Sequence, residues 1–320
     1  MKEQPIHSSG QLFERALQIA RAGRRKRVAV AVAQDMSVLE AVSAAESDGF
    51  LDAVLVGDAA AVNGLAEQCG LDITGMEMID EPDSLKAAHR AVALAAAGDV
   101  HAVMKGSLPT SSLLKVILEK QYRLCARATL SHCAVLDIPG YHKLLNLTDG
   151  GVVVRPDRRQ KFEILENAVL VGRALGLSPV KIALAGAYEV PSEKLPHSYS
   201  DADFIIPEVM AKLDDVAIQG PLPFDLAAGR ATAAGQQIAG SVAGDADVYL
   251  VDSLEECNVL AKSLIRFARA VFAGVIVGAT VPVSLASRSD LAAHKKASLA
   301  LACLLSDFYT THHVRDEGNG

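Results

Sequence analysis

The chain has 320 residues, enough for one large domain or two of ordinary size, and half of the residues are hydrophobic, so a substantial core can form. A net charge of −7 and an aromatic content of 4%, with no Trp, argue against a general binder of nucleic acid. Five cysteines, never in a Cys-x-x-Cys arrangement, indicate free thiols in a reducing compartment. We find no signal-peptide pattern and no uninterrupted apolar run of membrane-spanning length, so we expect a soluble, cytoplasmic protein.

The basic run Arg24–Arg27 is interpreted as the solvated end of the first helix rather than as a site that steers phosphate-bearing ligands.

Short apolar runs alternate with helical stretches in the first half of the chain. The expected strands are Val28–Ala33, Leu51–Val56, Met76–Ile79 and Ala102–Met104, and the expected helices between them are Ser37–Ser47, Ala59–Cys69 and Ser84–Ala97. Continuous apolar strands between helices are typical of a parallel sheet that is covered by helices on both faces. The predicted fold class is therefore α/β.

The second half continues this pattern. Its expected strands are Leu144–Leu147, Lys181–Ala185, Val216–Gln219, Val248–Val251 and Ala273–Gly278, and its expected helices are Gln160–Leu175, Ser200–Leu213 and Leu291–Leu305. The Pro139-Gly140 stretch and the turn at Pro282 are the expected crossings between two lobes. We therefore expect a discontinuous first lobe, residues 1–139 plus 284–320, and a second lobe, residues 140–283.

A hydroxyl, a guanidinium and a carboxylate lie close together at the last strand-to-helix junction, as Ser287, Arg288 and Asp290. Strand ends and helix N-termini are where open α/β sheets bind small anions. The structural alternative is that a serine caps the following helix, Asp290 offsets the helix dipole and Arg288 is solvated.

A second segment between a predicted strand and a helix has the chemistry to hold phosphate. Lys105 supplies a cation, Gly106 lets the backbone approach a ligand, and Ser107 and Thr110 offer hydroxyls. The glycine spacing of a Walker loop is missing, and a turn with Pro109 at the first helical position is the alternative.

Polar side chains and glycines in further loops are candidate ligand contacts. They are Thr148, Asp149, Asp225, Gly244, Asp245 and Asn258. Each also has a structural alternative, such as a turn or a helix cap. Because the carboxylates lie in different loops without metal-ligand spacing, we predict no metal site.

Taken in order, these segments resemble the phosphate acyltransferases, the phosphotransacetylase and phosphotransbutyrylase family, from about Val100 to Ala300. The sequences Lys-Gly-Ser-Leu-Pro-Thr at 105–110 and Ser-Arg-Ser-Asp at 287–290 are more similar to the butyryl-type branch than to the acetyl-specific enzymes. The resemblance implies a reversible reaction in which acyl-CoA and phosphate give acyl phosphate and CoA, with CoA and phosphate as substrates and no permanently bound cofactor. It also implies two α/β lobes with the site in a cleft, as in isocitrate/isopropylmalate dehydrogenases, and usually a homodimer.

The resemblance also assigns roles to residues. Ser287 and Arg288 match the catalytic Ser-Arg pair of the family. Acetyl-type members carry their catalytic aspartate further downstream, where this chain has His294–Lys296, so Asp290 is either the base or only a helix cap. By the same likeness, phosphate or the CoA pyrophosphate is expected to bind at Lys105 and the amides near Gly106. Gly150-Gly151 stands where relatives usually have Ala-Ala, and we expect this to widen the space beside the site.

Two other interpretations stay open. An NAD-linked dehydrogenase of related fold would need clustered aspartates for a divalent metal and a Tyr/Lys pair, and that cluster is not apparent. A catalytically weak, CoA-binding regulatory homologue would fit the altered acidic position after Ser287-Arg288.

Overall fold

The computed structural model describes residues 4–189, 196–287 and 290–312. The chain divides into two compact units. The N/C unit contains residues 9–128 and 272–320, and the middle unit contains residues 1–8 and 129–271. The unit boundaries fall earlier in the chain than Pro139 and Pro282, because the strand at 131–137 pairs with a middle-unit strand and the strand at 271–277 pairs with an N/C-unit strand.

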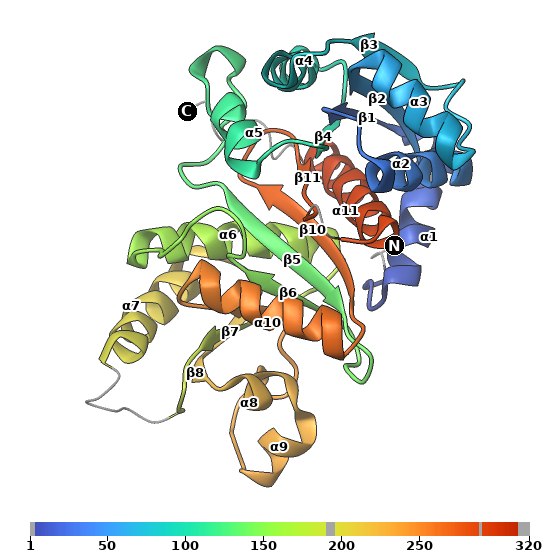
Figure 1. The fold of residues 1–320 in the computed structure, drawn as a ribbon. Coiled ribbons are helices and arrows are strands. Elements are labelled where there is room, and N and C mark those ends of the chain that lie inside the picture. The colour runs from blue at the N-terminus through green and yellow to red at the C-terminus, as the bar shows by residue number, and fades with distance from the viewer. Residues whose placement is uncertain (1–3, 190–195, 288–289, 313–320) are drawn as a thin grey trace. The chain divides into compact units, whose positions relative to one another are not determined.

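The sheet of the N/C unit has the strand order β3-β2-β1-β4-β11-β10 (Figure 1). These strands are β1 (Lys26–Ala31), β2 (Leu51–Gly57), β3 (Glu77–Asp80), β4 (Ala102–Lys105), β10 (Val271–Val277) and β11 (Val283–Ser284). The pairings are parallel except for β10 with β11. Val28 of β1 lies beside Ala53 and Ala102 in the register, and all three are buried.

Helices cover both faces of this sheet. They are α1 (Ser9–Ile19), α2 (Met36–Asp48), α3 (Ala59–Cys69), α4 (Ser84–Ala97), α5 (Thr110–Ile117) and α11 (Ala292–Thr311). Helices α2 and α11 pack against each other on one face, and α4 and α5 pack together on the other (Figure 1). The aspartates Asp35, Asp58 and Asp83 each cap the helix that follows them by accepting a backbone amide, which fixes where α2, α3 and α4 begin.

The sheet of the middle unit has the strand order β5-β6-β9-β7-β8. These strands are β5 (Ser131–Asp137), β6 (Leu144–Thr148), β7 (Val180–Ala185), β8 (Val216–Leu222) and β9 (Val248–Leu250). Only β5 with β6 is antiparallel among the described pairings of this sheet. The carboxyl ends of the parallel strands therefore share one edge, where β6 ends at Thr148 and β9 at Leu250.

The helices of the middle unit are α6 (Arg158–Ala174), α7 (Pro196–Lys212), α8 (Phe224–Ala228), α9 (Arg230–Gly235) and α10 (Leu254–Phe267). Helices α6 and α7 pack together on one face of the sheet, and α10 lies over β6 on the other (Figure 1). No helix in the described part of the chain is long and apolar enough to span a membrane.

The interpretation of the basic run Arg24–Arg27 as the solvated end of the first helix holds for Arg24, which is exposed and ends the helical segment Ala20–Arg24 after α1. It is wrong for Lys26 and Arg27, which lie in β1. Lys26 lies in β1, is buried and pairs with Asp307 at 2.9 Å, and Arg24 pairs with the same carboxylate. Arg27 pairs with Glu77 on β3. These ion pairs link β1 and the segment before it to α11 and β3. The paired cations are therefore not free to bind phosphate-bearing ligands.

Candidate active site

Two loops leave neighbouring parallel strands at the same edge of the N/C sheet. One follows β4 and leads from Lys105 into α5, and the other follows β11 and leads through Ser287 toward α11. Ser284 of β11 lies beside Met104 of β4, so the two loops start side by side. Open α/β sheets bind small anions at the carboxyl ends of their parallel strands. The main candidate segments predicted from the sequence, at Lys105 and at Ser287, both lie there.

The loop after β4 is folded onto the end of β1. The Gly106 amide donates to the carbonyl of Ala31 at 2.9 Å, and the Ser107 amide donates to that of Val32 at 2.7 Å. A Cβ on Gly106 would lie 2.1 Å from the Val32 oxygen. The close approach that this glycine permits is therefore to β1 itself, and a side chain at this position would separate the two segments.

Lys105 lies buried under this loop. Its Nζ donates to the carbonyls of Gly106 at 3.2 Å and Leu108 at 3.3 Å. Thr110 is the first residue of α5, so the first amides of that helix have no partner within the helix and carry its positive dipole end. An ammonium, the hydroxyls of Ser107 and Thr110 and a helix start thus lie within one short segment.

The loop after β11 is held by hydrogen bonds between Asp290 and the backbone of Ser287. The Asp290 Oδ2 accepts a hydrogen bond from the Ser287 amide at 2.6 Å, and the Asp290 amide donates to the Ser287 carbonyl at 3.1 Å. Helix α11 begins at Ala292 with Leu291 at its N-cap, so Asp290 does not cap that helix. Arg288, the central candidate of the motif, lies outside the described residues.

Lys295, a residue that no sequence pattern indicated, supports this loop. The side chain comes from α11, is 2% exposed, and donates through Nζ to the carbonyls of Ser287 at 3.1 Å and Asp290 at 2.8 Å. Burial lowers the pKa of Lys295, while the carboxylates of Asp35 and Asp290 oppose that shift. No apolar stripe singled out Lys295, because α11 is buried on nearly all sides between His294 and Asp307.

In the middle unit, Thr148 is the last residue of strand β6, Asp149 follows it, and both residues are buried. The Thr148 hydroxyl donates to the His132 carbonyl at 3.1 Å. The Asp149 carboxylate accepts the amides of His132 at 3.1 Å, Gly151 at 2.7 Å, Val152 at 2.9 Å and Val153 at 3.3 Å. Burial raises the pKa of Asp149, and these amide bonds oppose the shift. The pair thus fixes the loop that follows β6.

Asn258 of α10 joins the same loop, because its Nδ2 donates to the Gly150 carbonyl at 3.3 Å. The expected widening at Gly150-Gly151 is wrong. A Cβ on Gly150 would lie 2.8 Å from the Cys257 Sγ, and a Cβ on Gly151 would lie 3.0 Å from the His132 Cγ. His132 and Cys257 fill the space that alanine methyls would take. Burial lowers the pKa of His132 to about 4, so this filling imidazole is neutral at pH 7.

The other middle-unit candidates lie elsewhere. Asp225 is exposed in the first turn of α8. Gly244 and Asp245 come before the amino end of β9, at the edge of the sheet opposite to Thr148. The Gly244 amide donates to Leu226 at 2.7 Å, and a Cβ on Gly244 would lie 2.7 Å from the Arg230 Cα, so close packing against α9 requires this glycine.

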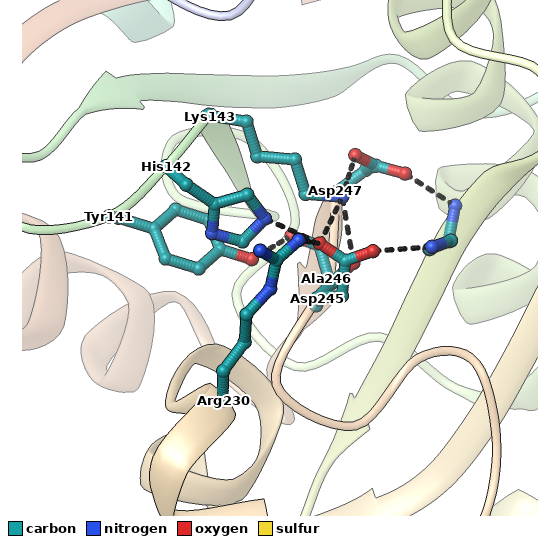
Figure 2. Close-up of polar contacts among 8 residues, drawn as sticks. Tyr141, His142, Lys143, Arg230, Asp245, Ala246 and Asp247 are labelled. Atoms are coloured by element: carbon teal, nitrogen blue, oxygen red, sulfur yellow. Dashed lines mark hydrogen bonds and ion pairs between the residues drawn. The ribbon is translucent and has the colours of Figure 1, made fainter.

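Asp245 is the centre of an ion cluster (Figure 2). Its carboxylate contacts cationic or imidazole nitrogens of His142, Lys143, Lys181 and Arg230. Partial burial raises its pKa, but the hydrogen bonds from Lys181 and His142 and the charges of Lys143 and Arg230 hold the pKa of Asp245 far below its usual range. Asp247 beside it pairs with Lys143 at 2.6 Å. The structure thus brings Thr148, Asp149 and Asn258 together at the carboxyl ends of the strands. Asp245 lies at the amino end of β9, where its carboxylate is already paired with cations.

Across the described ranges, no group of three or more His, Cys, Asp or Glu side chains is arranged to hold a metal ion. Cys69, Cys125, Cys133, Cys257 and Cys303 are all free thiols.

Comparison with known proteins supplies the family. A model described as "Phosphate acetyl/butaryl transferase" matches residues 11–89 and 84–303. The chain belongs to this family. It is 35% identical over 294 residues to the phosphate butyryltransferase of Clostridium acetobutylicum, which covers 92% of this chain and 98% of that relative. It is 31% identical over 294 residues to the phosphate acetyltransferase of Thermotoga maritima, covering 92% and 99%.

Solved structures agree with this phosphate acyltransferase assignment. A branched-chain phosphotransacylase from Enterococcus faecalis is similar with a TM-score of 0.78 and 31% identity, covering 88% of this chain and 99% of that one. A 4-hydroxythreonine-4-phosphate dehydrogenase from Salmonella typhimurium is similar in fold alone, with a TM-score of 0.56 and 16% identity over 88% of this chain and 99% of that one. The expected dehydrogenase-like α/β fold is confirmed, and the enzyme is an acyltransferase.

Proposed function

We propose that this phosphate acyltransferase moves a short acyl group reversibly between the thiol of CoA and inorganic phosphate, with no permanently bound cofactor. The observation that carries the proposal is the carboxyl edge of the N/C sheet. There the Lys105 loop and the Ser287 loop leave adjacent strands β4 and β11, next to the start of α5. Relatives named for butyryl and acetyl transfer match nearly the whole chain.

In the direction that forms acyl phosphate, an oxygen of phosphate attacks the carbonyl carbon of the thioester. The C–O bond forms, the C–S bond breaks, and the CoA thiolate leaves and takes up a proton. Arg288 is proposed to bind the phosphate and the developing oxyanion, because the planar guanidinium fork matches both. Ser287 is proposed to orient the carbonyl or the thiol. A donor aimed at a developing oxyanion contributes roughly 2.7–4 kcal/mol, which corresponds to at least about a hundredfold in rate.

Asp290 is proposed to position this motif rather than to act as the base. Its carboxylate is already engaged by the Ser287 amide at 2.6 Å. The role left for Asp290 is to hold the backbone at Ser287.

Phosphate or the CoA pyrophosphate is proposed to bind at Lys105, Gly106, Ser107 and Thr110. The buried ammonium of Lys105 and the dipole of α5 supply positive potential there. The proposed substrate-binding positions of the middle unit are Thr148, Asp149, Asp225 and Asn258. Gly244 packs against α9 and Asp245 is held by its ion pairs, so no substrate contact is proposed for these two residues. Thr148 and Asp149 would act by fixing the Gly150 loop, to which Asn258 donates.

We also propose that the enzyme is a cytoplasmic homodimer. Free cysteines are compatible with a reducing compartment. Helix α10 presents Val259, which is 69% exposed, and Phe267, which is 84% exposed, to solvent. The same helix has exposed Glu255 and Glu256 in its first turn and exposed Arg266 near its end. An antiparallel pair of α10 helices would cover the apolar side chains and bring opposite charges together.

The test is a set of initial rates with acetyl-, propionyl-, butyryl- and isobutyryl-CoA plus phosphate, scored by release of free thiol. We expect thiol release that depends on phosphate, and the butyryl-type resemblance favours the four-carbon substrates. Arg288→Ala and Ser287→Ala should fold normally and lose most of the rate. Arg159→Ala is the matched control, because Arg159 is exposed on α6 and pairs only with the neighbouring Glu163 among the described ion pairs.

Absence of thiol release with every acyl-CoA would overturn the proposal. NADH formation from a hydroxy acid would instead support a dehydrogenase. CoA binding in calorimetry without exchange in either direction would support a regulatory homologue.

A further inference from the structure

Lys295 joins the first turn of α11 to the loop in front of it. The Nζ lies 3.1 Å from the Ser287 carbonyl and 2.8 Å from the Asp290 carbonyl. These two residues are the ends of the segment that contains Arg288. One ammonium on a helix therefore holds both ends of the Ser287–Asp290 loop at a fixed separation.

The electrostatic surroundings of Lys295 do not favour its presence for stability. The side chain is 2% exposed, and burial lowers its pKa. The charged groups that face it are Asp35 from the loop after β1 and Asp290, and the neighbouring titratable group on its own helix is His294. Among the described residues, no carboxylate lies within 4.0 Å of the Lys295 ammonium. Burial of an amine without a directly paired carboxylate is unfavourable, so the two carbonyl hydrogen bonds are what offset its desolvation.

The Ser287–Asp290 loop is also held by a second contact, made by Asp290 itself. The Asp290 carboxylate accepts the Ser287 amide, so Lys295 and Asp290 hold different backbone atoms of the same residue. An amide is fixed by an anion and a carbonyl by a cation. Such a pair of restraints fixes the backbone of Ser287 on both sides of its Cα, which neither restraint would do alone.

We propose that Lys295 is a positioning residue of the acyl-transfer site, whose ammonium sets the backbone orientation at Ser287 and Asp290 and thereby the placement of the Ser287 side chain. This inference rests on the proposed function of the Ser287–Asp290 motif. Lys295 acts through the loop and does not touch the substrate, because its Nζ is engaged by two carbonyls. A misplacement of reacting groups by about 1 Å can lower a rate by about a hundredfold.

The test compares Lys295→Met, Lys295→Arg and the control Lys296→Met, with butyryl-CoA and phosphate as substrates. Lys296 is the adjacent lysine on α11 and pairs with Asp48 on α2, away from the loop. For Lys295→Met we expect kcat to fall about 10- to 100-fold, KM for butyryl-CoA to change less than about threefold, and Tm to change by less than about 3 °C, because the loss of two carbonyl bonds opposes the gain from removing a buried amine. Lys295→Arg keeps a cation with several donors, so it should recover part of the lost kcat.

Each outcome decides the inference. A Lys295→Met enzyme with the kcat of the Lys296→Met control would overturn it. A Lys295→Met enzyme whose Tm falls by several degrees together with its activity would also overturn it, because the role of Lys295 would then be structural. Recovery of kcat in Lys295→Arg, with Tm unchanged across the series, would support it. Failure of the proposed function itself is distinct, since the unmodified enzyme would then release no thiol.

Discussion

The Asp290 carboxylate receives the backbone amide of Ser287 at 2.6 Å, while the Asp290 amide donates back to the Ser287 carbonyl at 3.1 Å. The acid of the motif is thereby engaged with the backbone of its serine. Because Leu291 occupies the N-cap of α11, the carboxylate serves the loop and not the helix. This contact suits a residue that positions the loop rather than a catalytic base. The two roles predict different activities for variants of Asp290.

Asp290→Asn should keep most of the activity, and Asp290→Ala should not. The asparagine Oδ1 can still accept the Ser287 amide, so we expect its kcat to fall less than about tenfold. Alanine removes the acceptor and leaves the loop less restrained, so a fall of about a hundredfold is expected. Initial rates of thiol release measure both. A folded Asp290→Asn enzyme that is as inactive as Asp290→Ala would instead identify Asp290 as a proton acceptor.

Gly150→Ala should destabilise the middle unit. The new Cβ would lie 2.8 Å from the Cys257 Sγ, and overpacking of this kind lowers the free energy of unfolding by about 1–3 kcal/mol. Urea unfolding monitored by circular dichroism measures the change. Adding Cys257→Ala should restore most of the loss, because it removes the atom that clashes. The matched control is Gly64→Ala in α3, where a Cβ would meet nothing within 4 Å and stability should rise. Equal effects at Gly150 and Gly64 would contradict the packing described around Gly150.

Asp245→Asn should lower the free energy of unfolding by about 1–3 kcal/mol at pH 7, because it removes the anion around which four nitrogen-bearing side chains gather. Partial burial raises the pKa of Asp245, but its hydrogen bonds and neighbouring cations lower it further, so the folded pKa lies below the unfolded one. The stabilisation is therefore present above about pH 4 and is lost as the pH falls through the folded value.

Urea titrations of the unmodified enzyme and of Asp245→Asn at several pH values test this sign. The difference in free energy should be constant near neutrality and should shrink below about pH 4. Asp203→Asn, an exposed aspartate on α7, should change stability by less than about 0.5 kcal/mol at every pH. A difference between the enzyme and Asp245→Asn that grows on acidification would contradict the assignment.

Local signals were enough to predict much of the fold. The predicted ranges of α3 and α4 match the structure at both ends, because an aspartate starts each helix and a glycine in the left-handed region ends it, Gly70 for α3 and Gly98 for α4. Strand β5 was missed because it pairs antiparallel with β6, outside the alternation of strands and helices that revealed the parallel strands.

The site was predictable only where its chemistry is local. The segments at Lys105 and Ser287 were found because each follows an apolar strand and precedes a helix. The Asp245 cluster depends on partners that are far away in the sequence, such as His142 and Lys181, so no spacing revealed it. Lys295 was missed for a related reason, since its partners are backbone carbonyls, which sequence patterns do not display.

Phe267→Glu should convert the proposed homodimer into a monomer. Phe267 is 84% exposed at the end of α10, and a carboxylate there would have to be desolvated in the pair of helices. Light scattering after gel filtration measures the mass against the 33.6 kDa of one chain. The matched control is Met210→Glu on α7, where a residue that is 57% exposed should tolerate the charge without a change in mass. If the unmodified enzyme is a dimer and Phe267→Glu leaves its mass unchanged, the interface lies elsewhere. Dissociation of Phe267→Glu, together with an intact dimer for Met210→Glu, would assign the contact to α10, because only there would a buried charge oppose association.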